Sequence, residues 1–289
     1  MPGDPEDIGL TRPEAASTTD FVVLNPLLTS ELRGIRVFDV GQGDCIGLLD
    51  QHDKVFCYVD YGGLANHPDA GNPGNTAMRL PVRVGTEFVS IILTHWDKDH
   101  YYSAYKKNRA AESCEWIVPR QWASPLAVSM AARLTRAMCW PEFVGAAPAR
   151  YAVGPDHSIE IRKCQPFDPK DSNQDRNSSG LAVTLRLSVN GKLSTYMLLP
   201  GDCHYDGIPA RPRAPIRALL AYHHGSKTDW TKHTALAIAA PGPKHALVYS
   251  YGHPKWTPVT ANYSPDWDPP TVTHTPSLRG GTGFVDVLW

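Results

Sequence analysis

The densest group of chemically capable side chains lies in residues 94 to 100, with the sequence Thr-His-Trp-Asp-Lys-Asp-His. This stretch directly follows the apolar run 88 to 93, whose β-branched and large apolar residues predict a buried strand. Imidazole and carboxylate without thiolate suit Zn²⁺, Mn²⁺ or Fe²⁺, and two carboxylates between two histidines can serve a pair of cations. The sequence therefore predicts a metal site at the end of this strand, with the ligands His95, Asp97, Asp99 and His100.

Further ligand-type residues follow apolar, strand-like runs elsewhere in the chain. They are Asp60, Asp202, the pair His223 and His224, and His253 in a late turn. Strand ends at one edge of a sheet bring together residues that are far apart in the sequence, so we expect these side chains to share one cleft. For His253 alone, an ordinary histidine in a turn is an equally good interpretation.

The elements that must position these residues can be predicted from hydrophobic pattern and turn residues. Helical spacing, a serine N-cap and a proline in the first turn predict a helix over residues 124 to 138. Asn190-Gly191 predicts the turn of a β-hairpin. Proline, glycine and asparagine predict a surface loop over residues 64 to 80. Strands are expected over residues 34–40, 45–49, 55–59, 181–187, 194–199 and 218–222.

Composition is that of a globular protein. The 289 residues are 42% hydrophobic with a net charge of -1, so no global basic field would recruit nucleic acid or a membrane. The six cysteines are scattered and we expect them to be reduced and structural. The composition of residues 1 to 20 predicts a flexible arm, and we expect residues 21 to 289 to form one domain. No apolar segment predicts a signal peptide or membrane span, so we expect a cytoplasmic location without membrane contact.

The order of these motifs resembles the metallo-β-lactamase superfamily, and within it the hydrolase domain of ComEC-type DNA-uptake proteins. The resemblance covers the chain from about Gly34 onward. It implies an α/β fold, specifically a four-layer αββα sandwich with a one- or two-metal site at one edge of the sheets. The matching segments are 39–44 (Asp-Val-Gly-Gln-Gly-Asp), Asp60 with Gly62, 95–100, Asn177 with Ser179, Gly201-Asp202, 223–226 and 251–254.

The resemblance implies two divalent ions, Zn²⁺ or Mn²⁺, that activate a shared water and neutralise a developing oxyanion. We expect one cation on His95, Asp97 and Asp202, and the other on Asp99, His100, Asp202 and His224. Asp60 is expected to support ligand geometry. Side chains alternate along a strand, so we expect His223 to donate a proton or a hydrogen bond, or to support the site, while His224 binds metal.

Two departures from the family pattern bear on the site. Asp97 replaces the second histidine of the commoner His-x-His-x-Asp-His motif. The superfamily's middle histidine has no clear counterpart, because His157, the one histidine between residues 101 and 200, lies in a polar turn and is not expected to be a ligand. The candidate catalytic residues are Asp99, His223 and His253.

Three functions remain open at this point. The resemblance favours a phosphodiesterase or nuclease acting on nucleic acid or a small phosphodiester. A carboxyl-ester, lactone or β-lactam hydrolase is the enzymatic alternative, because the same hydroxide attacks carbonyl carbon. The third is a binding module without catalysis. A basic and aromatic stretch after the metal motif could contact nucleic acid, or form an ordinary solvated helix face: Lys98, Tyr101, Tyr102, Tyr105, Lys106, Lys107 and Arg109.

Overall fold

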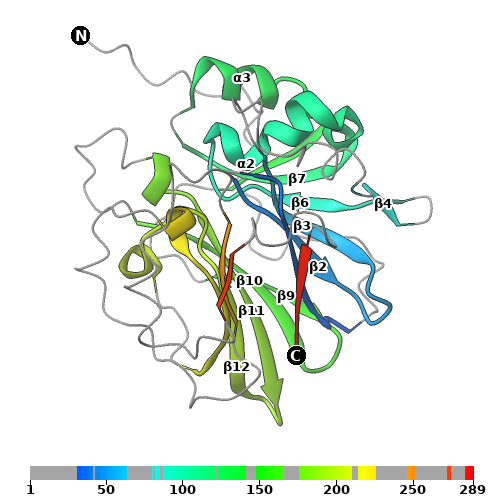
Figure 1. Cartoon of the computed structure of the whole chain (residues 1–289), viewed down its shortest axis with the longest axis vertical. Helices are drawn as coiled ribbons and strands as arrows, with labels where there is room; N and C mark the ends of the chain where they lie inside the picture. The colour runs from blue at the N-terminus through cyan, green and yellow to red at the C-terminus, as the bar shows by residue number, and fades with distance from the viewer. Residues whose placement is uncertain are drawn as a thin grey trace.

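Two seven-stranded sheets form the framework of the protein, in a computed structural model (Figure 1). Among the described residues, no helix is long and apolar enough to cross a membrane. The predicted arm lies outside the described residues, as does nearly all of the predicted loop at 64 to 80. The structure describes residues 31–41, 43–63, 80, 82–84, 87–121, 123–140, 148–165, 176–209, 214–225, 246–250, 272–274 and 284–289.

The first sheet has the strand order β16-β1-β2-β3-β6-β7-β8. Strands β16, β1, β2 and β3 pair antiparallel, whereas β3, β6, β7 and β8 pair parallel. A separate two-stranded piece consists of β4 (Arg83–Val84) and β5 (Glu87–Phe88). The strands of the first sheet are β1 (Gly34–Phe38), β2 (Cys45–Leu49), β3 (Val55–Tyr61), β6 (Ser90–Ile92), β7 (Glu115–Pro119), β8 (Arg136–Trp140) and β16 (Phe284–Leu288).

The second sheet has the order β15-β14-β13-β12-β11-β10-β9 and is also mixed. Strands β9 to β12 pair antiparallel, and β12 to β15 pair parallel. The predicted hairpin is confirmed, because Asn190 and Gly191 both have positive φ and connect β11 to β12. The strands are β9 (Ala149–Val153), β10 (His157–Lys163), β11 (Leu181–Val189), β12 (Lys192–Leu199), β13 (Ile216–Leu220), β14 (Ala246–Tyr249) and β15 (Val272–His274).

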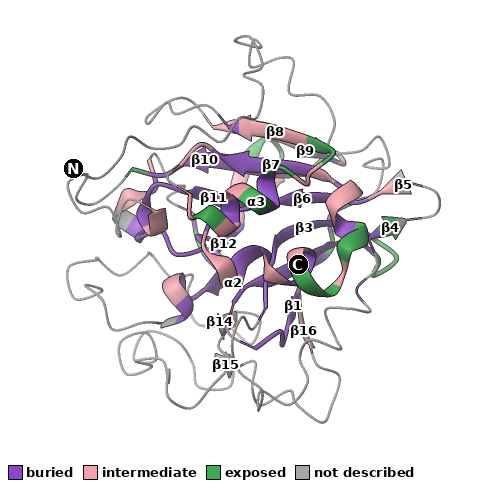
Figure 2. Cartoon of the chain, turned by 90° about the horizontal axis from the view of Figure 1, so that it is seen from above, coloured by how far each residue is buried: buried purple, intermediate pink, exposed green. Residues whose placement is uncertain are grey.

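Three apolar clusters order these elements into layers. The largest lies between the sheets and joins Val37, Ile92, Ile161 and Leu199. A second fills the space between the outer face of the first sheet and the helices α2 (Lys98–Tyr102) and α3 (Pro125–Ala131). The third covers the outer face of the second sheet under the short turn η3 (Tyr205–Gly207). The predicted fold class, two facing mixed sheets with helices outside, is confirmed; Figure 2 shows the buried strands.

The helix predicted over residues 124 to 138 is right at its start and wrong at its end. The Ser124 hydroxyl accepts a hydrogen bond from the Ala127 amide, as an N-cap does, but α3 ends at Ala131. Residues 136 to 140 instead form β8 and pair with β7. In β8, Met138 packs toward the core between the sheets and Ala137 toward the helices, so pairing with β7 gives both faces of the segment an apolar partner.

The six cysteines are free, and all but Cys139 are buried, as expected for small structural side chains. Burial raises the pKa of Cys57 and Cys114, the latter to about 12, so these thiols are held in their neutral form. These two residues therefore lack the environment of a reactive thiolate.

Close backbone packing joins the turns that end β3 and precede β2 to helix α2. The Gly62 amide donates to the Asp44 carbonyl at 2.8 Å, and the Gly63 amide donates to the Asp99 carbonyl at 2.9 Å. A Cβ atom on Gly62 would overlap the Asp99 carbonyl oxygen. Only glycine therefore allows α2 to approach this edge of the sheet.

We predict that Gly62→Ala lowers the free energy of unfolding by about 3 kcal/mol, because the contact is with backbone and cannot be relieved by a rotamer change. Gly191→Ala is the matched control, because its φ is +74° and no atom lies within 4 Å of the place that a Cβ atom would take; it should cost only about 1 kcal/mol. Denaturant unfolding of the three proteins measures both values. An equal loss of unfolding free energy in the two variants would show that α2 is not tightly packed against Gly62.

Candidate metal centre

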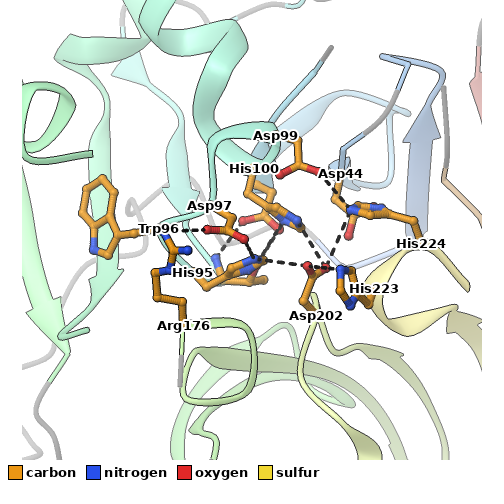
Figure 3. Close-up of polar contacts among 12 residues, drawn as sticks. Asp44, His95, Trp96, Asp97, Asp99, His100, Arg176, Asp202, His223 and His224 are labelled. Atoms are coloured by element: carbon orange, nitrogen blue, oxygen red, sulfur yellow. Dashed lines mark hydrogen bonds and ion pairs between the residues drawn. The ribbon is translucent and has the colours of Figure 1, made fainter. Parts of the chain in front are cut away.

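The predicted ligands come together at one edge of the two sheets, as Figure 3 shows. Each comes from a strand end or the turn beside it, and both sheets contribute. Thr94 links the sheets there, because its amide and hydroxyl donate to Asp60 at 2.7 Å each and its carbonyl accepts from the Leu181 amide at 2.7 Å. The converging residues are Asp44 before β2, Asp60 in β3, His95 and Asp97 after β6, Asp99 and His100 in α2, Asp202 after β12, and His223 and His224 after β13.

The carboxylate of Asp202 lies between four imidazole rings. Its Oδ2 atom is 3.4 Å from His95 Nε2 and 3.5 Å from His223 Nε2. Its Oδ1 atom is 3.3 Å from His100 Nε2 and 3.7 Å from His224 Nε2. The two oxygens of one carboxylate therefore face two different pairs of nitrogen atoms.

Two further carboxylates divide between these pairs. Asp97 Oδ2 is 4.0 Å from His95 Nε2, whereas Asp99 Oδ2 is 3.3 Å from His224 Nε2. We call the group around Asp202 Oδ2 the first position, formed with His95, Asp97 and His223. We call the group around Asp202 Oδ1 the second position, formed with Asp99, His100 and His224.

The buried donor atoms around His100 and Asp202 fit a divalent cation. His100 Nδ1 lies 2.8 Å from Asp60 Oδ2, so a proton between them leaves the Nε2 lone pair directed at Asp202. His95 Nε2, His100 Nε2 and Asp202 Oδ1 are buried and find no hydrogen-bond partner among the described residues. Buried lone pairs that face one another are costly unless a cation lies between them. Candidate ligand atoms lie within 4.8 Å of one another in three groups of described residues: His95, His100 and Asp202; Asp99, His100 and His224; and Asp44, Asp60 and His100. The first of these groups spans both positions, and Asp97 and His223 belong to none of them.

The electrostatics of the site also favour positive charge. Burial opposes protonation of His100, but the carboxylates of Asp60 and Asp202 outweigh it and hold the pKa of His100 well above its usual 6.5. Burial likewise opposes protonation of His224, and Asp44 and Asp202 still raise its pKa. The imidazoles around Asp202 overcome its burial and hold its pKa well below 3.8. Protons and metal ions compete for the same nitrogen atoms at such a site.

Asp60 supports the second position without lying beside Asp202. It is fully buried and holds both Thr94 and His100. Its φ of 57° is unusual for a residue with a side chain. These hydrogen bonds fix the ring of His100, which is the supporting role expected for Asp60.

Asp44 plays a parallel role that was not predicted from the sequence. Its Oδ1 atom lies 3.5 Å from His224 Nδ1, on the side of the ring opposite to Asp99. Asp44 is buried, and neither carboxylate oxygen has a hydrogen-bond partner within the described part of the chain. The signal available in the sequence was its place in the 39–44 motif. Each histidine of the second position thus has a buried carboxylate behind it.

The prediction that His223 and His224 point in different directions is wrong. They do not continue a strand, because their φ values are 46° and 55°, in the left-handed region. That backbone brings both rings to the same carboxylate, Asp202. Two consecutive residues of this kind are strained, which is typical of positions held for function.

Several other predicted residues lie elsewhere. His253 is outside the described residues, and nothing tests its role. His157 lies against Trp289, with ring centroids 5.5 Å apart, and joins none of the candidate metal groups. Tyr101 cannot stack on a nucleic-acid base, because it is fully buried against Trp96. Arg109 pairs with Glu112, which agrees with a solvated helix face.

Comparisons with known proteins found similarity only to solved structures, at low identity and low TM-score. No family model and no curated protein matches the chain. CmlA, a diiron β-hydroxylase from Streptomyces venezuelae, has 12% identity and a TM-score of 0.37, over 66% of this chain and 34% of CmlA. The metallo-β-lactamase MIM-1 from Novosphingobium pentaromativorans has 11% identity and a TM-score of 0.33, over 76% of each chain. An archaeal metallo-β-lactamase superfamily protein from Sulfolobus tokodaii has 10% identity and a TM-score of 0.33, over 62% of this chain and 69% of that protein.

These neighbours include proteins named as metallo-β-lactamase superfamily members. This chain spans about one third of CmlA.

We predict that Asp44→Asn weakens metal binding at the second position by about 10-fold, because a neutral amide gives less charge support to the His224 ring. Competition with a chromophoric chelator measures the affinity. Asp286→Asn is the matched control, because it removes a partly buried carboxylate that pairs with Arg36 outside the metal centre. It should lower stability and leave metal affinity unchanged. An unchanged affinity in Asp44→Asn would mean that Asp44 does not support the site.

Proposed function

We propose that this chain is a hydrolase that uses two divalent cations, Zn²⁺ or Mn²⁺, to cleave phosphodiester bonds. The observation that carries this proposal is the placement of Asp202, whose two oxygens each face a separate pair of imidazole nitrogens at 3.3 to 3.7 Å. A carboxylate so placed can bridge two cations. When bound, such cations would lower the pKa of a water molecule and neutralise negative charge that develops on the substrate.

We assign the proposed ligands to the first and second positions defined above. The second keeps the set expected from the sequence: Asp99, His100, Asp202 and His224. The first gains a residue, because the distance of His223 from Asp202 equals that of His95 within 0.1 Å. We therefore assign His223 to the first position with His95, Asp97 and Asp202, in place of the proton-transfer role expected for it.

The residues on the solvent-exposed side of the site are polar, which supports hydrolysis of a polar substrate. Asp97, Asp99 and His223 are partly exposed, whereas His95, His100 and Asp202 are buried. His224 and His100 overcome the burial of Asp99 and hold its pKa below the usual value, so this carboxylate remains ionised at neutral pH and suits a cation ligand better than a proton acceptor.

A phosphodiester is the better substrate class for two reasons. The motif order resembles ComEC-type hydrolase domains. The partly exposed side chains of the site are also charged or ionisable, with Asp97 3.6 Å from Arg176, whereas a β-lactam or lipophilic ester would need an apolar pocket. The net charge of -1 leaves the choice between nucleic acid and a small phosphodiester to experiment.

Incubation of the metal-loaded protein with bis(p-nitrophenyl) phosphate, single-stranded DNA, duplex DNA and RNA tests the proposal. We expect cleavage of at least one of them, reduced to background in the His95→Ala/Asp202→Asn double variant because both cation positions lose ligands. His52→Ala, an exposed histidine away from the site, should behave as wild type.

Two results would contradict the proposal. A well-folded protein that binds no metal and cleaves nothing would indicate a binding module. A protein with two bound ions that cleaves p-nitrophenyl acetate and none of the phosphodiesters would indicate a carboxyl-ester hydrolase.

A further inference from the structure

Arg176 lies at the metal centre although it belongs to none of the sequence motifs. It precedes β11 in the chain, and its Nη1 atom is 3.6 Å from Asp97 Oδ1. Figure 3 shows its side chain beside Asp97 and His95. Asp97 therefore directs one oxygen toward Arg176 and the other toward His95 Nε2.

The backbone of Arg176 is anchored to the metal-binding turn. Gln121 donates from Nε2 to the Arg176 carbonyl at 2.6 Å and to the Ser179 hydroxyl at 3.0 Å. The same Gln121 side chain accepts from the Trp96 amide at 3.1 Å. One amide side chain thus fixes the segment that carries Arg176 relative to His95 and Asp97.

The side chain of Arg176 is also partly exposed to solvent. The side chains of Asp97, Arg176 and His223 are 29%, 31% and 33% exposed, whereas those of His95 and Asp202 are 1% and 3% exposed. Among the four residues of the first position and Arg176, these three are the side chains that solvent reaches most. Two of the three lie side by side as a carboxylate and a guanidinium.

We propose that Arg176 binds an anionic oxygen of the substrate at the first position and so restricts the site to a reacting group that carries negative charge. This inference rests on the proposed function and narrows its substrate class. A guanidinium presents a planar fork of donors that matches the paired oxygens of a phosphate or carboxylate, and its charge persists at any working pH. A neutral ester offers no such partner.

Three other basic residues near the metal motif contact residues that are not metal ligands. Arg109 pairs with Glu112, and Lys106 lies over the Tyr105 ring at 4.7 Å from its centroid. Lys163 is buried and donates to the carbonyls of Arg120 and Ser179. Arg176, in contrast, pairs directly with a residue of the first position.

The test compares an anionic and a neutral substrate in metal-loaded proteins of verified metal content. In Arg176→Gln, kcat/KM for bis(p-nitrophenyl) phosphate should fall by about 10- to 100-fold, as expected for loss of a charge-assisted hydrogen bond. Turnover of p-nitrophenyl acetate should stay within about 2-fold of wild type, and Arg176→Lys should lie between, because lysine keeps the charge and loses the fork. Arg136→Gln, which breaks an exposed pair with Glu115 at 3.4 Å, is the matched control and should change neither rate.

A second readout does not depend on turnover. Calorimetric titration with inorganic phosphate should show about 10-fold weaker binding to Arg176→Gln than to wild type, with the metal content of both unchanged. If no ester is cleaved but phosphate binding weakens in this way, the proposed function fails and the anion-binding role stands. The anion-binding role would be overturned if the phosphate affinity of Arg176→Gln were unchanged. It would also be overturned if the variant lost metal and lost the two ester-cleavage rates equally, because Arg176 would then only hold Asp97 in place.

Discussion

The carboxylate of Asp202 is buried among four imidazoles, and the rest of the site depends on how its charge is compensated. Burying an isolated carboxylate at this depth would destabilise the folded protein. If the ring nitrogens that face it were neutral, their lone pairs would repel its negative charge. Positive charge must therefore reside there, as protons on His100 and His224 or as metal ions. The same constraint explains why the surrounding groups come in opposed sets: Asp97 and Asp99 on the outside, and Asp44 and Asp60 behind the rings.

The fold meets this constraint by placing strand ends from two sheets at one edge. Thr94 hydrogen-bonds to Asp60 in the first sheet and to Leu181 in the second, so the turn that carries His95 is held from both sides. The cost is visible in the backbone. Asp60, His223 and His224 all have positive φ, and they persist because hydrogen bonds and packing around them over-determine their positions.

The sequence predicted those parts of the site that local pattern controls. The ligands at 95 to 100 lie within six residues and follow an apolar run, and Asp202 follows a hairpin, so motif and strand could be identified together. Arg176 depends on a contact between distant segments, which no local pattern encodes, and the 39–44 motif marked Asp44 without indicating its contact with His224. His223 and His224 point to the same carboxylate because both have left-handed backbone, a conformation that a pair of histidines does not predict. The error at β8 arose because an alanine-rich segment suits helix until a neighbouring strand offers it a partner.

Electron paramagnetic resonance of the Mn²⁺-loaded protein tests most directly whether Asp202 joins two cations. Bridging by Asp202 predicts that the protein takes up about two ions per chain and gives the spectrum of an exchange-coupled pair. Spectra of isolated, uncoupled Mn²⁺ at full loading, or uptake of a single ion, would contradict a bridged centre.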